Sequence, residues 1–294
     1  MNIEELLNRK HIVFDGATGT EFQRLGLSGG TPPEQWVFDK PEVLKDIHRA
    51  YVQAGADVIE TCTFGANRER LKASELKNSI ATLNRRAVEI AREIAGEHVC
   101  VAGSVGPLGG IIEPYGEITV ADAENIFAEQ IASLLEAKVD LLVIETMMWS
   151  QEALVAFRTA KRLGAKIVGV TFTFEPTPDG PRTSFGESVS DIVTVFRNEP
   201  LSFIGSNCGS GFSVMRDVVK EYRSATQLPL LIQTNAGIPI LENGKNHYPE
   251  SPESFGMFVQ EIANLGVQMI GGCCGTTPAH IAEACKRIKN VLVH

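Results

Sequence analysis

The chain has 294 residues, of which 44% are hydrophobic and 21% charged, and this composition excludes a disordered, collagen-like or small disulfide-stapled protein. Its 27 basic and 36 acidic residues give a formal net charge of −9 without a basic patch, so nucleic-acid binding is not expected. The charged first ten residues do not resemble a signal peptide, and the longest uncharged stretch, 262–282, is too polar and glycine-rich to span a membrane. We therefore expect a cytoplasmic protein whose six cysteines are reduced.

Eight short apolar runs bounded by turn residues predict eight strands. They cover residues 12–15, 57–61, 99–103, 141–145, 167–171, 203–206, 230–233 and 268–271. Apolar residues spaced by three and four predict helices between the strands, the clearest at 41–52, 79–95, 121–135 and 151–163. Thr119 and Ser150 are the expected start signals of the last two helices.

Strands made of continuous Val, Ile and Leu runs are typical of a parallel sheet that helices cover on both faces. The eight strand and helix units predict an α/β fold, a single (β/α)8 TIM barrel that takes up residues 1–294 as one domain. A doubly wound open sheet is the structural alternative, because weak strands are easily miscounted.

Polar and glycine-rich segments follow most of the predicted strands, at the end of a barrel where catalytic residues lie. They are 15–20, 60–67, 104–109, 145–146, 207–209, 234–239 and 272–278.

Three of the cysteines follow strands at this same end of the predicted barrel. Cys208 comes after the sixth strand, and Cys273 with Cys274 comes after the eighth, so their sulfurs are expected to converge. Three thiolates are a ligand set suited to Zn²⁺, and they leave the fourth tetrahedral position open. The other three cysteines, Cys62, Cys100 and Cys285, are expected to be packing residues. His280 is not expected to be a metal ligand.

Asp15 and Glu145 end apolar strands where few other charges occur, and a buried carboxylate there is costly unless it meets a cation. A substrate ammonium group is one candidate, and an internal salt bridge or a helix N-cap is the alternative. The segment 15–20, with Ala17 and Thr18, resembles an anion-binding turn and suggests a carboxylate ligand.

Together these segments resemble the homocysteine S-methyltransferase family. The likeness covers almost the whole chain in the right order, and Gly-Gly-Cys-Cys-Gly at 271–275 with the upstream Asn207-Cys208 pair is its most specific part. The resemblance implies a zinc-bearing barrel that binds homocysteine through its sulfur, with Cys208, Cys273 and Cys274 as zinc ligands. It also implies that Asp15 and Glu145 position the ammonium group, and that Asn235 can give zinc an oxygen ligand while substrate is absent.

Residues 113–117, Glu-Pro-Tyr-Gly-Glu, are most similar to the homocysteine-binding domain of cobalamin-dependent methionine synthase. The barrel is expected to use the whole chain, so a methylcorrinoid donor would be carried by a separate protein, and methionine would be the product. S-methylmethionine, betaine, another thiol acceptor or a corrinoid-linked demethylation remains an alternative. A non-catalytic zinc or redox sensor is a third hypothesis, which the amino-acid pocket argues against.

Overall fold

The computed structural model describes residues 3–242 and 245–288. Its central sheet has eight parallel strands in the order β1-β12-β9-β8-β5-β4-β3-β2. These strands are β1 Ile12–Val13, β2 Val58–Glu60, β3 Cys100–Val105, β4 Leu141–Met147, β5 Val168–Phe172, β8 Phe203–Cys208, β9 Leu230–Thr234 and β12 Met269–Gly272. Each of the eight predicted strands is present.

The first and last strands of this order meet and bring the sheet close to a complete ring. Asp57 N donates to Val13 O at 2.7 Å, and Asp15 N donates to Val58 O at 3.0 Å. The fold is therefore the predicted TIM barrel, and the open-sheet alternative is wrong.

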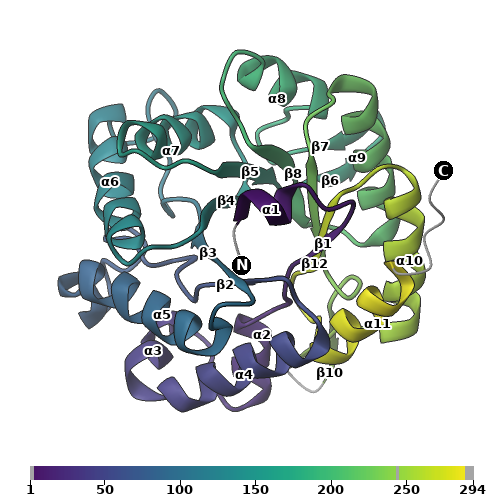
Figure 1. The fold of residues 1–294 in the computed structure, drawn as a ribbon. Helices are drawn as coiled ribbons and strands as arrows, with labels where there is room; N and C mark the ends of the chain where they lie inside the picture. The colour runs from purple at the N-terminus through teal and green to yellow at the C-terminus, as the bar shows by residue number, and fades with distance from the viewer. Residues whose placement is uncertain (1–2, 243–244, 289–294) are drawn as a thin grey trace.

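Helices form an outer layer around the barrel (Figure 1). They are α2 Gly19–Arg24, α3 Trp36–Asp39, α4 Pro41–Ala54, α5 Ile80–Ala95, α6 Val120–Glu136, α7 Ser150–Arg162, α8 Val189–Phe196, α9 Phe212–Ala225, α10 Pro252–Asn264 and α11 Pro278–Ile288, with the short 3-10 helices η1 Pro33–Gln35 and η2 Glu75–Asn78. The four helices predicted most clearly are confirmed to within two residues at each end. None of the described helices is long and apolar enough to cross a membrane.

The two predicted helix starts have different outcomes. Thr119 caps α6, because its Oγ1 accepts a hydrogen bond from Asp122 N at 3.0 Å. Ser150 is instead the first residue of α7, and its N–H donates to Glu187 Oε2 at 2.7 Å. A tertiary contact has replaced the local cap there.

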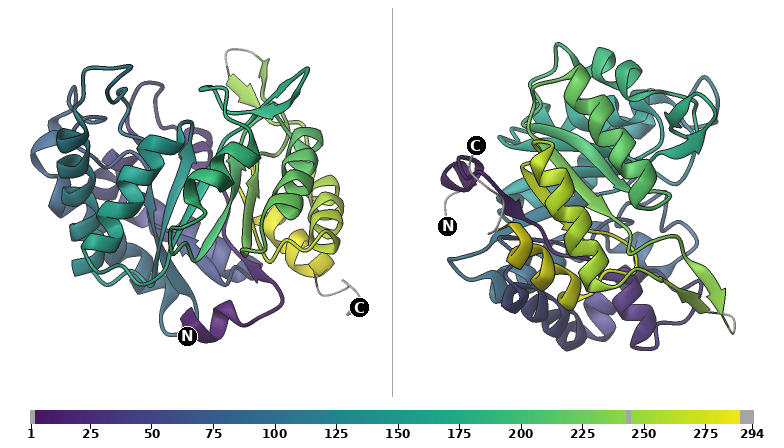
Figure 2. Two further views of the ribbon diagram at one scale, coloured as in Figure 1. Left: turned by 90° about the horizontal axis from the view of Figure 1, so that it is seen from above. Right: turned by 90° about the vertical axis from the view of Figure 1, so that its right-hand side faces the viewer.

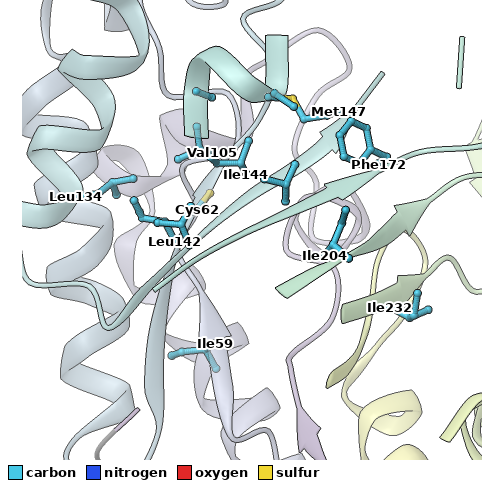
Figure 3. Close-up of a cluster of buried hydrophobic side chains, with 14 of the residues drawn as sticks. Ile59, Cys62, Val105, Leu134, Leu142, Ile144, Met147, Phe172, Ile204 and Ile232 are labelled. Atoms are coloured by element: carbon cyan, nitrogen blue, oxygen red, sulfur yellow. The ribbon is translucent and has the colours of Figure 1, made fainter. Parts of the chain in front are cut away.

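Apolar side chains fill two layers, one inside the barrel and one between strands and helices. The inner layer includes Phe14, Phe203 and Leu231, and it is completed by Leu6 of the short helix α1 Ile3–Leu7. This helix lies across the amino end of the barrel (Figure 1). Figure 3 shows part of the outer layer, to which Leu142 of β4 contributes.

Two β-hairpins project from the barrel at the end opposite to α1 (Figure 2). They are β6 Glu175–Thr177 with β7 Gly180–Arg182, and β10 Ile240–Glu242 with β11 Lys245–His247. The amino end of the barrel is thus packed with apolar side chains, while the carboxyl ends of the strands carry the long connections.

Candidate active site

A cavity of about 650 Å³ opens among the carboxyl ends of the strands. Strand ends and the residues after them supply much of its wall, which includes Ala17, Thr18, Glu60, Ser104, Glu145, Asn207, Cys208, Gln233, Cys273 and Cys274. The cavity therefore lies where catalytic sites of this architecture occur.

Three cysteines predicted to converge do so at one side of this cavity. The sulfurs of Cys208, Cys273 and Cys274 lie within 4.8 Å of one another. Cys208 ends β8 with φ +63°, a left-handed conformation that is uncommon for a residue other than glycine. The other two follow β12, and Cys273 N donates to Thr234 O at 2.8 Å, which anchors this turn to the end of β9.

The donor set of these cysteines fits a zinc ion. Hydrogen bonds from the thiols of Cys273 and Cys274 lower the pKa of Cys208 to about 3. The same contact with Cys208 raises the pKa of Cys274 to about 12 and also raises that of Cys273. The three sulfurs thus share protons that Zn²⁺ can replace, at a spacing compatible with Zn–S bonds of about 2.3 Å.

Asn235 contributes an oxygen beside this sulfur cluster. Its Nδ2 donates to Gly209 O at 2.9 Å, and its side chain also hydrogen-bonds to Cys208. Its Oδ1 is buried without a hydrogen-bond partner. An unpaired buried oxygen at this position fits a ligand atom for a metal.

Glu145 points into the cavity from an irregular part of β4. The register of β4 against β5 shifts between Ile144 and Met147, and Thr146 has φ +57°. Both oxygens of Glu145 accept hydrogen bonds, Oε1 from the Ser104 hydroxyl and Oε2 from Asn207 Nδ2 at 3.1 Å. Burial raises the pKa of Glu145 to about 7.

Two further carboxylates, Asp15 and Glu60, lie at the ends of β1 and β2. Asp15 is 1% exposed, and its Oδ2 accepts a hydrogen bond from Glu60 N at 3.0 Å. Glu60 Oε2 accepts one from Gln233 Nε2 at 2.8 Å. Burial raises the pKa of both carboxyls, and the charge of Glu145 raises both further.

The salt-bridge and N-cap alternatives for Asp15 and Glu145 do not apply. Within residues 3–242 and 245–288, neither Lys nor Arg pairs with these carboxylates or with Glu60. The helix after Asp15 has Thr18 at its N-cap and no side-chain cap. These three carboxyl groups are therefore buried together without a paired cation among these residues, because Arg70, which also lines the cavity, lies near Glu34 instead.

Ala17 and Thr18 line the cavity in the connection from β1 to α2. The N–H of Ala17 donates to Thr276 Oγ1 at 3.1 Å, so this donor is already occupied. Thr20 Oγ1 accepts a hydrogen bond from Gly275 N at 3.1 Å. This connection and the cysteine turn after β12 are thus held together.

A family model described as homocysteine S-methyltransferase matches residues 12–288. The chain belongs to the homocysteine S-methyltransferase family. The match includes all eight barrel strands and the three cysteines, so the family resemblance carried by the sequence motifs is confirmed.

Curated relatives of this family member include two methionine synthases. The protein from Mycobacterium tuberculosis is 29% identical over 305 residues and covers 98% of this chain, and that from Mycobacterium leprae is 30% identical over 299 residues and covers 95%. The alignments take in 25% and 24% of the two relatives, so this chain spans about a quarter of their length.

Solved structures of the homocysteine methyltransferase MmuM from Escherichia coli share the fold. The metallated form has a TM-score of 0.82 at 23% identity, covering 97% of this chain and 98% of that one. The oxidised form has a TM-score of 0.79 at 24% identity, covering 95% and 97%.

Several residues that shape the site are missing from the sequence-based candidates. Glu60, Gln233 and Asn207 all line the cavity, yet only Glu60 carried a signal, as a third carboxylate at the end of an apolar strand. Cys62, expected to be a packing residue, also lines the cavity, although it is 7% exposed. His280 is no part of the sulfur cluster, because its two ring nitrogens contact Thr277 and Glu250 O.

Removing one sulfur is expected to abolish zinc binding by this family member. Cys208→Ser, dialysed under reducing conditions, should retain a small fraction of the one zinc ion expected per wild-type chain, because two cysteines do not complete the site. Cys285→Ser is the control, since Cys285 lies on α11 and its sulfur contacts Gly55 O. Metal analysis measures both, and stoichiometric zinc in Cys208→Ser contradicts the assignment.

Neutralising Asp15 is expected to stabilise the free protein. The raised pKa means that folding opposes ionisation of the Asp15 carboxyl group. Asp15→Asn should therefore increase the free energy of unfolding at pH 8 by about 1 kcal/mol, which corresponds to a rise of about 2–4 °C in Tm. Below the unfolded pKa of about 4 the carboxyl is neutral in both states, so the gain should disappear.

Thermal unfolding across this pH range measures the effect of Asp15→Asn. Asp217→Asn, at an exposed position on α9, is the control and should change little. A lower Tm for Asp15→Asn at pH 8 would show that favourable interactions outweigh the burial of the charge.

Proposed function

We propose that residues 1–294 form one homocysteine-binding barrel domain that works as a zinc-dependent methyltransferase. Homocysteine is the acceptor, methionine is the product, and a methylcorrinoid on a separate protein is the donor. The observation that carries this proposal is that a single cavity joins a three-cysteine cluster to buried carboxylates. An aminothiol has the two groups that such a cavity accommodates, a sulfur at one end and an ammonium group at the other.

Each part of the cavity has a separate task in this proposal. Cys208, Cys273 and Cys274 would hold Zn²⁺, and Asn235 Oδ1 would supply an oxygen ligand in the absence of substrate. When bound, Zn²⁺ favours loss of the proton from the substrate thiol, whose ordinary pKa of about 8.5 keeps it mostly protonated at pH 7. The protein would then keep the sulfur oriented for in-line attack on the methyl carbon, so that the S–C bond forms as the bond between that carbon and the corrinoid breaks and its electron pair stays with the corrinoid.

The amino-acid end of homocysteine is positioned by the residues at the ends of β1 and β4. Asp15 and Glu145 attract the ammonium group, and its charge compensates for theirs. Ala17 and Thr18 let the substrate carboxylate approach the backbone of the connection, where N–H groups other than that of Ala17 can receive it.

The preference for a methylcorrinoid donor rests on sequence similarity. Residues 113–117 resemble the homocysteine-binding domain of cobalamin-dependent methionine synthase, and the two curated relatives described above are methionine synthases. A sensor that only binds zinc or changes redox state has no use for three buried carboxylates, because they destabilise the fold without a cationic ligand.

Homocysteine binding should release protons from the zinc-loaded protein. We expect at least one proton per homocysteine at pH 7, because the bound thiol loses a proton that the free thiol retains and the ammonium group favours ionisation of the buried carboxyl groups whose pKa is raised. Calorimetric titration in two buffers of different ionisation enthalpy gives this number. Cys208→Ser should bind much more weakly, and a wild-type protein that shows neither binding nor proton release contradicts the homocysteine assignment.

A panel of methyl donors tests the second half of the proposal. With homocysteine in excess, a methylated corrinoid protein should yield methionine, while S-methylmethionine and betaine should not. The control is the same panel with protein from which zinc has been removed. Methionine formation from S-methylmethionine or betaine, but not from the methylated corrinoid protein, would make the donor assignment wrong and leave the acceptor assignment intact.

A further inference from the structure

Gln233 reaches across the inside of the barrel to Glu60. It belongs to β9, whereas Glu60 ends β2, and β12 and β1 lie between these strands in the sheet. Gly271 of β12 leaves room for this crossing, because a Cβ at that position would lie 3.1 Å from Gln233 Cγ and 2.7 Å from Phe14 Cβ. The contact thus requires a residue without a side chain on the intervening strand.

Three acceptor oxygens of Gln233, Glu60 and the adjoining Asp15 have no hydrogen-bond partner among the described residues. Asp15 Oδ1, Glu60 Oε1 and Gln233 Oε1 are all buried and accept no hydrogen bond in the described structure. Gln233 lines the cavity although it is only 2% exposed. Since unpaired buried acceptors are costly, their concentration at one place indicates a ligand rich in N–H donors.

Glu145 differs from this group, because Ser104 and Asn207 already donate to its two oxygens. It supplies negative charge, but its hydrogen-bonding positions are partly taken. A primary ammonium group has three N–H donors and one positive charge, so it can satisfy three acceptors and compensate for a carboxylate at once.

We propose that Glu60, held in place by Gln233, is a third acidic residue that binds the substrate ammonium group and selects thiols carrying a primary amine. This assignment rests on the proposed homocysteine function and extends it to residues on β2 and β9. Asp15 orients Glu60 through the Glu60 N–H, and Gln233 fixes one carboxylate oxygen so that the other stays available. Burial and the neighbouring carboxylates raise the pKa of Glu60, which is consistent with a position that needs a cation.

The test compares homocysteine with 4-mercaptobutanoate, which is homocysteine without its amino group, as ligands of the zinc-loaded protein. Glu60→Gln should weaken homocysteine binding by about 10- to 100-fold, because a hydrogen bond to a charged group is lost. Binding of 4-mercaptobutanoate should not weaken, because that ligand presents no ammonium group. Gln233→Met should act in the same direction with a smaller effect.

Glu34→Gln is the matched control. Glu34 is a buried carboxylate that lines the same cavity, but it accepts a hydrogen bond from Gly65 N and lies near Arg70. This variant should leave the ratio of the two dissociation constants unchanged. Zinc content and Tm, measured for every variant, show whether a loss of binding comes from a damaged fold.

An unchanged ratio of the two dissociation constants in Glu60→Gln overturns the assignment of Glu60, whether both ligands weaken equally or neither does. Failure of homocysteine to bind the wild-type protein is a separate result. It would overturn the proposed function, and the role of Glu60 with it.

Discussion

The burial of three carboxyl groups without a paired cation among the described residues is the constraint on which the carboxyl end of this barrel depends. Asp15, Glu60 and Glu145 are buried, and the side-chain oxygens accept hydrogen bonds from neutral donors: a hydroxyl, two amides and a backbone N–H. Neutral donors fix the direction of a carboxylate without cancelling its charge. The site is therefore oriented in advance but remains electrostatically incomplete, which is the state that favours a cationic ligand over a neutral one.

The sulfur cluster and the carboxylates are parts of one connected framework. The turn that carries Cys273 is tied to the connection after β1 through Thr276 and Thr20. Tyr51 of α4 strengthens this tie, since its hydroxyl lies 2.9 Å from Ala17 O and 3.1 Å from Thr276 O. A displacement of one loop would thus disturb the other, so the distance between the sulfur cluster and the Asp15 carboxyl group is fixed by the protein.

The sequence allowed the barrel and the sulfur cluster to be predicted for the same reason. Continuous apolar runs mark buried parallel strands, and in a barrel the ends of such strands meet, so Cys208 and Cys273 could be brought together although they are far apart in the chain. The role of Gln233 could not be predicted, because its reach to Glu60 depends on a glycine on the intervening strand. No local pattern reports how far a side chain extends across a barrel.

Asn207 escaped prediction for a related reason. It precedes Cys208 and looked like part of the cysteine motif, but its Oδ1 accepts hydrogen bonds from Thr146 N and Thr171 Oγ1. It thereby supports the irregular end of β4 that turns Glu145 into the cavity. A tertiary contact that stabilises an unusual backbone conformation has no counterpart in helix or strand periodicity.

Two of the three described non-glycine residues with positive φ lie at the same end of the barrel as the buried carboxyl groups. Thr146 and Cys208 both have positive φ, each at or near a strand end that lines the cavity, and Asn207 lies between them in the hydrogen-bond network. Such conformations persist only where the surrounding structure holds them, and each destabilises the fold by about 1–3 kcal/mol. The opposite end of the barrel has one such conformation among the described residues, at Lys138 with φ +66° in the connection from α6 to β4, and it is filled by apolar side chains such as Leu6. Stability and function are therefore separated along the barrel axis: packing at the amino end offsets the strain and buried charge that the carboxyl end requires.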